Sequence, residues 1–138
     1  EFSFVQKEAA WGPSYVPVLQ VMFSHAGRKF QVRQALVDTG ADITILPLSY
    51  NTNFLKVDLD EEGAIELDSA GGGKFIAIPS REKITYTIAQ EGFRSIQWQG
   101  TVFFAPRQMC ALLGHHQCLE RLKLTFNGPA RKLKVEMT

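Results

Sequence analysis

The chain has 138 residues, a hydrophobic content of 45% and nearly balanced charge, with 15 Lys and Arg against 14 Asp and Glu. These totals are typical of one soluble domain with one core, and the small net charge does not indicate a nucleic acid or an anionic membrane as a partner. No apolar run approaches the about 20 residues that span a bilayer. We predict a single domain over residues 1–138.

The number of cysteines indicates whether the protein occupies a reducing or an oxidising compartment. The two cysteines can form at most one disulfide, which is not the dense framework of small secreted domains. A reducing, intracellular compartment is therefore favoured. Localisation otherwise stays open, because the domain could have been cut from a larger precursor.

Strand patterns dominate the first half of the chain. Residues 16–23 and 29–38 are rich in β-branched and apolar side chains and flank a short turn, so they predict a hairpin. The apolar pattern resumes at residues 43–46, and Pro47 ends it because proline has no N–H for a strand ladder. The polar residues 49–62 predict a loop that leads into a short strand.

The second half also consists mainly of strand patterns. Residues 64–78 alternate between apolar and polar on both sides of three consecutive glycines, which predicts a hairpin with a mobile tip. Alternation predicts further strands over residues 83–88 and 95–104.

The C-terminal part carries the only helical pattern in the sequence. Leu119 and Leu122 lie three residues apart among charged neighbours and predict one short helix. Extended segments over residues 122–126 and 133–135 follow it. The predicted class is therefore mainly β with one short C-terminal helix.

One short run of residues contains the candidate catalytic group. The apolar strand over residues 29–38 delivers Asp38 into a turn formed by Thr39 and Gly40. Such a strand holds a carboxylate rigidly, the threonine offers a hydroxyl for support, and the glycine lets the backbone come close to reactants. Taken alone, the same three residues could also form an ordinary Asx-type turn at the end of a strand.

Three features, in this order along the chain, resemble the retropepsin family, the aspartic proteases of retroviruses and their cellular and bacterial relatives. The first is the run LVDTGAD over residues 36–42, and the second is the glycine-rich hairpin, which is similar to the family's flap. The third is the run ALLG over residues 111–114 before a short helix, which resembles the segment that packs beneath the active-site loop. Together the three features cover about residues 16–126.

The resemblance implies a fold and a reaction. It implies a closed acid-protease barrel with one lobe per chain. The sequence contains a single Asp-Thr-Gly string, so two chains would form a homodimer around a two-fold axis near Asp38. Two facing carboxylates share one proton, so one accepts a proton from a water while the other polarises the scissile carbonyl. We expect hydrolysis of an extended peptide or polyprotein without a metal, a cofactor or a covalent intermediate, and fastest at acidic to mildly acidic pH.

The resemblance also implies roles for individual residues. Thr39 would hydrogen-bond across the dimer axis, and Gly40 would present its carbonyl to the substrate. Ala41 and Asp42 would bind the substrate further along its main chain. The flap that closes over the substrate would consist of Gly71, Gly72 and Gly73. The candidate pocket walls are Ile45, Leu46, Ile76 and Leu112.

The sequence departs from the family's pattern in two respects. An arginine commonly follows the ALLG-like segment and pairs with the carboxylate at the position of Asp42, whereas this chain has His115, which would make the pairing pH-dependent. Family dimers also commonly use a sheet woven from both termini, and this chain has extra residues before residue 16 and over residues 50–63. The dimer interface is therefore left open.

Other interpretations remain for each feature. The glycine-rich hairpin could be a plain flexible hairpin, and Asp42 could cap a turn or join a surface ion pair. A cluster of thiols and imidazoles could bind zinc, although its spacing matches no familiar zinc pattern; it consists of Cys110, His115, His116 and Cys118. A non-catalytic peptide-binding or assembly module with the same fold is the alternative function.

Overall fold

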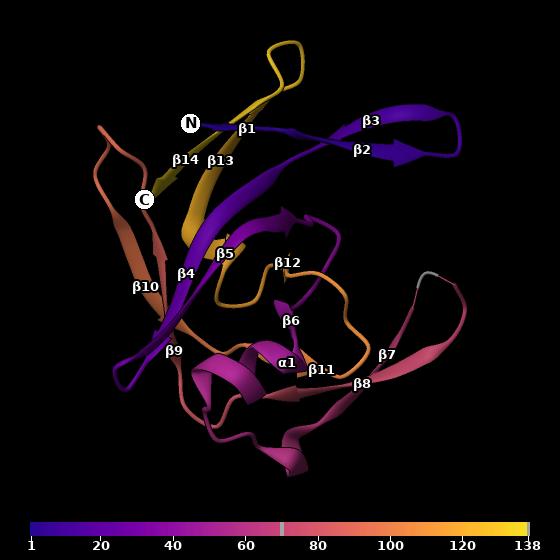
Figure 1. Cartoon of the computed structure of the whole chain (residues 1–138), viewed down its shortest axis with the longest axis vertical. Helices are drawn as coiled ribbons and strands as arrows, with labels where there is room; N and C mark the ends of the chain where they lie inside the picture. The colour runs from indigo at the N-terminus through magenta and orange to yellow at the C-terminus, as the bar shows by residue number, and fades with distance from the viewer. Residues whose placement is uncertain (70, 138) are drawn as a thin grey trace.

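The computed structural model describes residues 1–69 and 71–137. Ala70, in the predicted hairpin over residues 64–78, and Thr138 lie outside the described residues. The predicted class is confirmed, because the protein is mainly β with one short helix (Figure 1).

The largest sheet contains nine of the described strands. These are β4 (Val18–His25), β5 (Arg28–Val37), β6 (Ile45–Pro47), β7 (Ile65–Asp68), β8 (Lys74–Pro79), β9 (Ile84–Ile88), β10 (Ile96–Gly100), β11 (Phe103–Ala105) and β12 (Leu112–Leu113). Their order is β10-β9-β4-β5-β12-β6-β11-β8-β7. This order has two free ends, so the predicted closed barrel is not found among residues 1–69 and 71–137.

Two smaller sheets complete the described part of the chain. The first contains β1 (Phe2–Ser3), β13 (Leu122–Asn127) and β14 (Lys132–Met137) in the order β1-β14-β13, with Phe2 opposite Leu133. Both ends of the chain therefore meet in one sheet. The second consists of β2 (Val5–Ala9) and β3 (Gly12–Val16). No strand was predicted before residue 16.

Both predicted hairpins are confirmed. The first is β4 and β5, which pair as far as His25 and Arg28. Its two turn residues, Ala26 and Gly27, have φ angles of 49° and 82°. Two positive φ angles are typical of the tight turn whose twist matches that of the flanking strands. The second hairpin is β7 and β8, which projects from the body of the protein (Figure 1).

The predicted strand over residues 95–104 is divided into β10 and β11, which have different partners. β10 pairs with β9, whereas β11 pairs with β6 and β8. The break lies where Gly100 packs against Gln117, since a β-carbon there would stand 2.5 Å from the Gln117 carbonyl oxygen. The next two N–H groups donate to side chains instead of to a strand: Thr101 to Gln117 Oε1 at 2.7 Å and Val102 to Ser80 Oγ at 3.2 Å.

The predicted helix position was wrong. After Gly114 the chain forms only a single 3-10 turn, Leu119–Arg121, and β13 begins at the next residue. Leu119 is buried in the core, while Leu122 already belongs to the strand, so the spacing of three did not reflect a helical face.

The helical segment lies instead in the predicted polar loop. It consists of α1 (Leu48–Tyr50) and one π-helical turn, Asn51–Leu55; a 3-10 turn, Glu61–Gly63, follows later in the chain. Asn51 is buried, and its amide donates to the carbonyl oxygen of Val57 at 3.1 Å while its Oδ1 accepts from the N–H of Val57 at 2.8 Å. Lys56, with a left-handed φ of 52°, ends the helical segment.

The core lies against the central strands. The ring of Tyr86 on β9 lies 4.9 Å from the ring of Phe23 on β4 and 4.9 Å from that of Trp98 on β10. Buried side chains of β5, β6 and β12 continue this core. The fully packed strands therefore provide a rigid base for the loop that follows β5.

Candidate active site

Asp38 follows directly after β5 and is held by the neighbouring strand. Leu36 and Val37 at the end of β5 lie opposite Leu112 and Leu113 of β12 in parallel register. The N–H of Asp38 donates to the carbonyl oxygen of Leu113 at 3.0 Å, and its side chain is half-buried. The position of the carboxylate is therefore set by the packed sheet.

The turn after β5 orients the Asp38 carboxylate. The N–H of Gly40 donates to Oδ1 of Asp38 at 3.0 Å, and the N–H of Ala41 donates to the Asp38 carbonyl oxygen at 3.1 Å. This is the geometry of an Asx-type turn. The turn interpretation and the catalytic interpretation are compatible, because the turn engages one carboxylate oxygen and leaves the other for a ligand.

A second segment, residues 114–116, supports the turn through its backbone. The N–H of Gly114 donates to Oγ1 of the buried Thr44 at 3.1 Å. The N–H of His115 donates to the carbonyl oxygen of Ala41 at 3.0 Å, and the N–H of His116 donates to the backbone carbonyl oxygen of Asp42 at 2.8 Å. The predicted contact between the segment after β12 and the loop after β5 is therefore present.

The side chain of His115 has a different partner from the one expected. Its Nε2 lies 2.6 Å from the carbonyl oxygen of Thr39. A carbonyl oxygen only accepts, so Nε2 carries the proton and donates. Within the described part of the chain, no ion pair joins His115 to Asp42. The imidazole therefore contacts the backbone of the loop and not the carboxylate of Asp42.

Asp38 faces a cleft of about 370 Å³ between this loop and the β7–β8 hairpin. The predicted residues Asp38, Ala41 and Asp42 line it. Thr39 and Gly40 lie exposed in the same loop but not in the lining. The other lining residues are Ile43, Ile45, Leu67, Asp68, Ser69, Phe75, Gln108 and Leu112.

The β7–β8 hairpin contributes its side chains in a way that the sequence interpretation missed. Gly71, Gly72 and Gly73 lie exposed at its tip and do not line the cleft. Leu67 and Phe75, which pair directly across the two strands, do line it. The alternation of side chains along the two strands could have identified these residues, because residues opposite each other in a hairpin share one face.

Two of the four candidate pocket-wall residues lie in the lining of this cleft. Ile45 and Leu112 line the cleft, whereas Leu46 is fully buried in the core. Ile76 is 54% exposed and lies outside the cleft lining. Successive residues of a strand point to opposite faces, so Ile76 lies on the face opposite its neighbour Phe75.

The cleft is acidic. Its described lining includes Asp38, Asp42 and Asp68 and contains no lysine or arginine. Lys74, opposite Asp68 in the β7–β8 hairpin, forms ion pairs there: its Nζ lies 3.8 Å from Asp68 and 3.3 Å from Glu66. One chain brings a single Asp-Thr-Gly carboxylate to this cleft.

The cysteine and histidine cluster is not assembled into a binding site. Cys118 is fully buried, whereas Cys110, His115 and His116 are exposed. Residues 1–69 and 71–137 contain no group of three or more His, Cys, Asp or Glu placed to hold a metal ion. Burial raises the pKa of the Cys118 thiol to about 12, although a hydrogen bond with Thr44 acts in the opposite direction. This thiol behaves as a core side chain.

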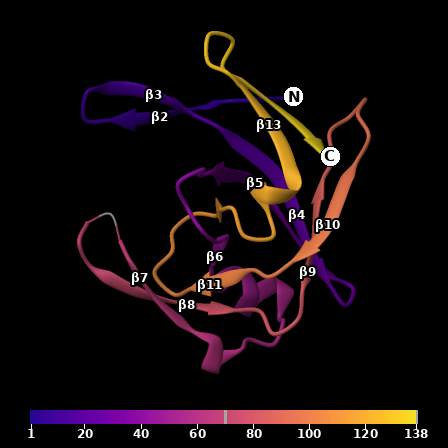
Figure 2. The ribbon, with the colours of Figure 1, turned by 180° about the vertical axis from the view of Figure 1, so that it is seen from behind.

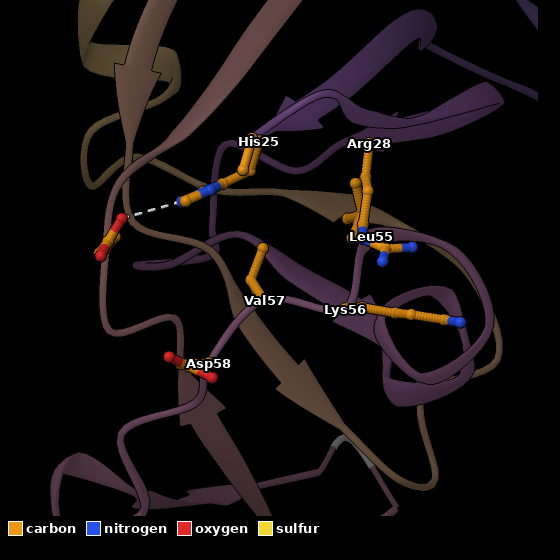
Figure 3. Close-up of a pocket in the computed structure, with 8 residues that line it drawn as sticks. His25, Arg28, Leu55, Lys56, Val57 and Asp58 are labelled. Atoms are coloured by element: carbon orange, nitrogen blue, oxygen red, sulfur yellow. Dashed lines mark hydrogen bonds and ion pairs between the residues drawn. The ribbon is translucent and has the colours of Figure 1, made fainter.

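A second cavity, of about 200 Å³, lies near the turn between β4 and β5 (Figure 3). His25, Arg28, Lys56 and Asp58 line it, together with Glu82, whose carboxylate lies 3.0 Å from His25 Nε2. Figure 3 shows Lys56 pointing away from His25. None of the predicted site residues lines this cavity.

Comparison with known proteins adds no assignment. The chain matches no family model and no curated protein. Among residues 1–69 and 71–137, none of the helices has the length and apolar content of a membrane span.

Proposed function

We propose that this chain is one lobe of a retropepsin-like aspartic endopeptidase that acts as a homodimer. The observation that supports this most is the setting of Asp38. Its carboxylate follows a packed strand, accepts a hydrogen bond from its own turn and faces a partly apolar cleft that a hairpin borders on the other side. A rigid carboxylate in such a cleft is suited to acid–base chemistry.

The proposed reaction needs two copies of Asp38. A two-fold axis near the loop brings the two carboxylates together, and their mutual repulsion favours a state in which they share one proton. The ionised carboxylate takes a proton from a water molecule, which attacks the peptide carbonyl carbon. The protonated carboxyl gives its proton to the carbonyl oxygen, which yields a neutral tetrahedral diol. The carboxyl that took the proton of water then passes it to the nitrogen as the C–N bond breaks, and the other carboxylate takes back a proton from the diol, so that a carboxylic acid and an amine are released.

The cleft supports an extended peptide as the substrate. Apolar side chains come from both walls, including Ile43 and Ile45 on one side and Leu67 and Phe75 on the other. We expect bulky apolar side chains beside the cleaved bond, because burying one is worth about 1.5–3 kcal/mol. The strands of the β7–β8 hairpin would cover the peptide and exclude water from the reacting atoms.

Cleavage of a diverse peptide mixture by the purified protein tests the proposal. Asp38→Asn keeps the shape of the side chain but removes its charge, so we expect cleavage to fall by about 100- to 10,000-fold or more. Asp58→Asn is the matched control, because Asp58 lines the other cavity, and it should cleave like the wild type. Circular dichroism should show both variants folded.

Two outcomes would contradict the proposal. A folded Asp38→Asn protein that cleaves at the wild-type rate would show that Asp38 does not carry the reaction. A wild-type dimer that binds peptides and a statine inhibitor but cleaves nothing would instead indicate the alternative function, a non-catalytic peptide-binding or assembly module.

A further inference from the structure

The β2–β3 hairpin, here called the arm, has no strand partner outside itself in the described chain. Val5 lies opposite Val16 and Ala9 opposite Gly12, which leaves Ala10 and Trp11 as the turn. A two-stranded hairpin that packs against nothing is marginally stable in water. The arm projects from the body of the protein in Figure 1.

The base of the arm is tied to the rest of the protein. The guanidinium of Arg131 lies 3.5 Å from the centre of the Tyr15 ring, and the N–H of Phe4 donates to the Arg131 carbonyl oxygen at 2.8 Å. Just after the arm, the carbonyl oxygen of Pro17 accepts a hydrogen bond at 3.0 Å from Val37, the residue before Asp38. The cation–π contact and these hydrogen bonds give the arm a defined direction relative to the candidate active site.

The tip of the arm exposes a large aromatic side chain. Trp11 is 84% exposed, whereas the other tryptophan, Trp98, is 6% exposed. A single exposed apolar residue is ordinary on a protein surface. Here, however, it stands at the end of a hairpin that lacks a partner, and tryptophan is enriched among residues that dominate interface affinity.

The arm lies on the side that a second copy would approach. The arm and the β7–β8 hairpin project to the same side of the protein, with the loop between β5 and β6 between them, in both views (Figures 1 and 2). That loop carries Asp38. A two-fold axis close to Asp38 therefore brings the second copy onto the face that the two hairpins flank.

β1 and β14 already pair within one chain, in the sheet β1-β14-β13. A sheet in which β1 of one chain pairs with β14 of another would have to break this pairing. Pro13, on the outer part of the arm, lacks an N–H, which makes β3 a poor edge for strand pairing. A contact through the Trp11 side chain at the tip does not depend on strand pairing at either edge of the arm.

We propose that the arm is a dimerisation element that packs Trp11 against a second copy of this chain. The inference rests on the proposed function, because that function requires the second copy. In a two-fold dimer each chain contributes one arm, so both copies of Trp11 lose their exposure together.

Sedimentation equilibrium of the full chain tests the role of Trp11. Trp11→Ala should raise the dimer dissociation constant at least about tenfold, as expected for an aromatic residue at the centre of an interface. Phe93→Ala is the matched control, because Phe93 is also exposed, at 64%, but lies in the turn between β9 and β10 on the other side of Figure 1. It should dimerise like the wild type. A folded Trp11→Ala protein that dimerises as tightly as the wild type would overturn the inference.

Fluorescence quenching by acrylamide provides a second test in the unaltered protein. Because Trp98 is buried, the quenchable emission comes from Trp11. Quenching should weaken as the protein concentration rises through the dissociation constant. Equal quenching of monomer and dimer would contradict burial of Trp11, and so would a chain that stays monomeric at every concentration.

The two proposals fail in different ways. If the wild-type dimer cleaves peptides and Trp11→Ala forms the same dimer, the arm inference is wrong and the proposed function stands. If Trp11 is protected in a dimer that shows no cleavage dependent on Asp38, the arm inference stands and the proposed function is wrong.

Discussion

At Gly114 the chain passes so close to the loop after β5 that a β-carbon would stand 2.2 Å from the carbonyl oxygen of Ile43. Backbone on both sides cannot move without breaking the hydrogen bonds that hold Asp38. We predict that Gly114→Ala destabilises the fold by about 1–3 kcal/mol or more, as overpacking does, and lowers activity further by displacing the loop. Urea unfolding measures the first effect.

Gly128→Ala is the control for this substitution. Gly128 lies in the turn between β13 and β14, and a β-carbon there would meet nothing within 4 Å. Its free energy of unfolding should stay within about 0.5 kcal/mol of the wild-type value. Equal stability of the two variants would mean that the close approach at Gly114 is not a constraint on the fold.

Because the Cys118 thiol is buried, we predict that the folded protein becomes less stable as the pH rises above about 9. This thiol has a pKa of about 12 in the folded protein, against an ordinary value of 9.0, because it is buried. The unfolded chain therefore loses this proton first as the pH rises. The contribution of the protonated Cys118 thiol to the free energy of unfolding is fully present below about pH 9. It is lost as the pH approaches 12, by at most about 1.4 kcal/mol per pH unit.

Urea unfolding at about pH 8 and pH 10 checks this prediction. The fall in unfolding free energy between these values should be smaller in Cys118→Ala and unchanged in Cys110→Ala, whose thiol is exposed. Tyr86, whose pKa burial also raises, acts in the same direction at still higher pH. The explanation fails if removing the Cys118 thiol leaves the pH dependence as it was.

At the scale of elements, the β7–β8 hairpin has one face toward the cleft and one face away from it. Phe75 lines the cleft, and its neighbour Ile76 lies on the opposite face. We predict that Phe75→Ala lowers kcat/KM by about tenfold or more, since it loses about 1.5–3 kcal/mol of apolar contact with the substrate. Ile76→Ala should have little effect. Steady-state cleavage of one peptide compares them, and similar losses in both would argue against the cleft as the substrate site.

The elements also show which parts of the secondary structure the local sequence pattern predicts and which parts it does not. The hairpin of β4 and β5 was predictable, because its alternation and its turn are local properties. The helical segment over residues 48–55 was not, since it depends on the buried amide of Asn51, which binds the backbone of Val57 six residues later. The pattern near Leu119 predicts a helix where the structure has a 3-10 turn, because two apolar residues three positions apart are compatible with several structures.

At the scale of the whole molecule, the proposed dyad of two chains predicts that activity depends on concentration. Below the dissociation constant of the dimer, the rate should fall with roughly the square of the chain concentration, because each active site needs two copies. A dilution series, with the dimer fraction measured by sedimentation, checks this. Constant activity per chain in solutions shown to be monomeric would contradict a shared site.

The sequence by itself determined the class, the first hairpin and the place of Asp38 at the end of an apolar strand. Those features follow from periodicity and from turn chemistry, which act over a few residues. Only the tertiary structure decided that Phe75 and not the glycine tip borders the cleft, and that His115 binds the Thr39 carbonyl. It also decided that the two ends of the chain pair with each other. Such choices depend on which distant groups packing brings within reach, and no short pattern carries that information.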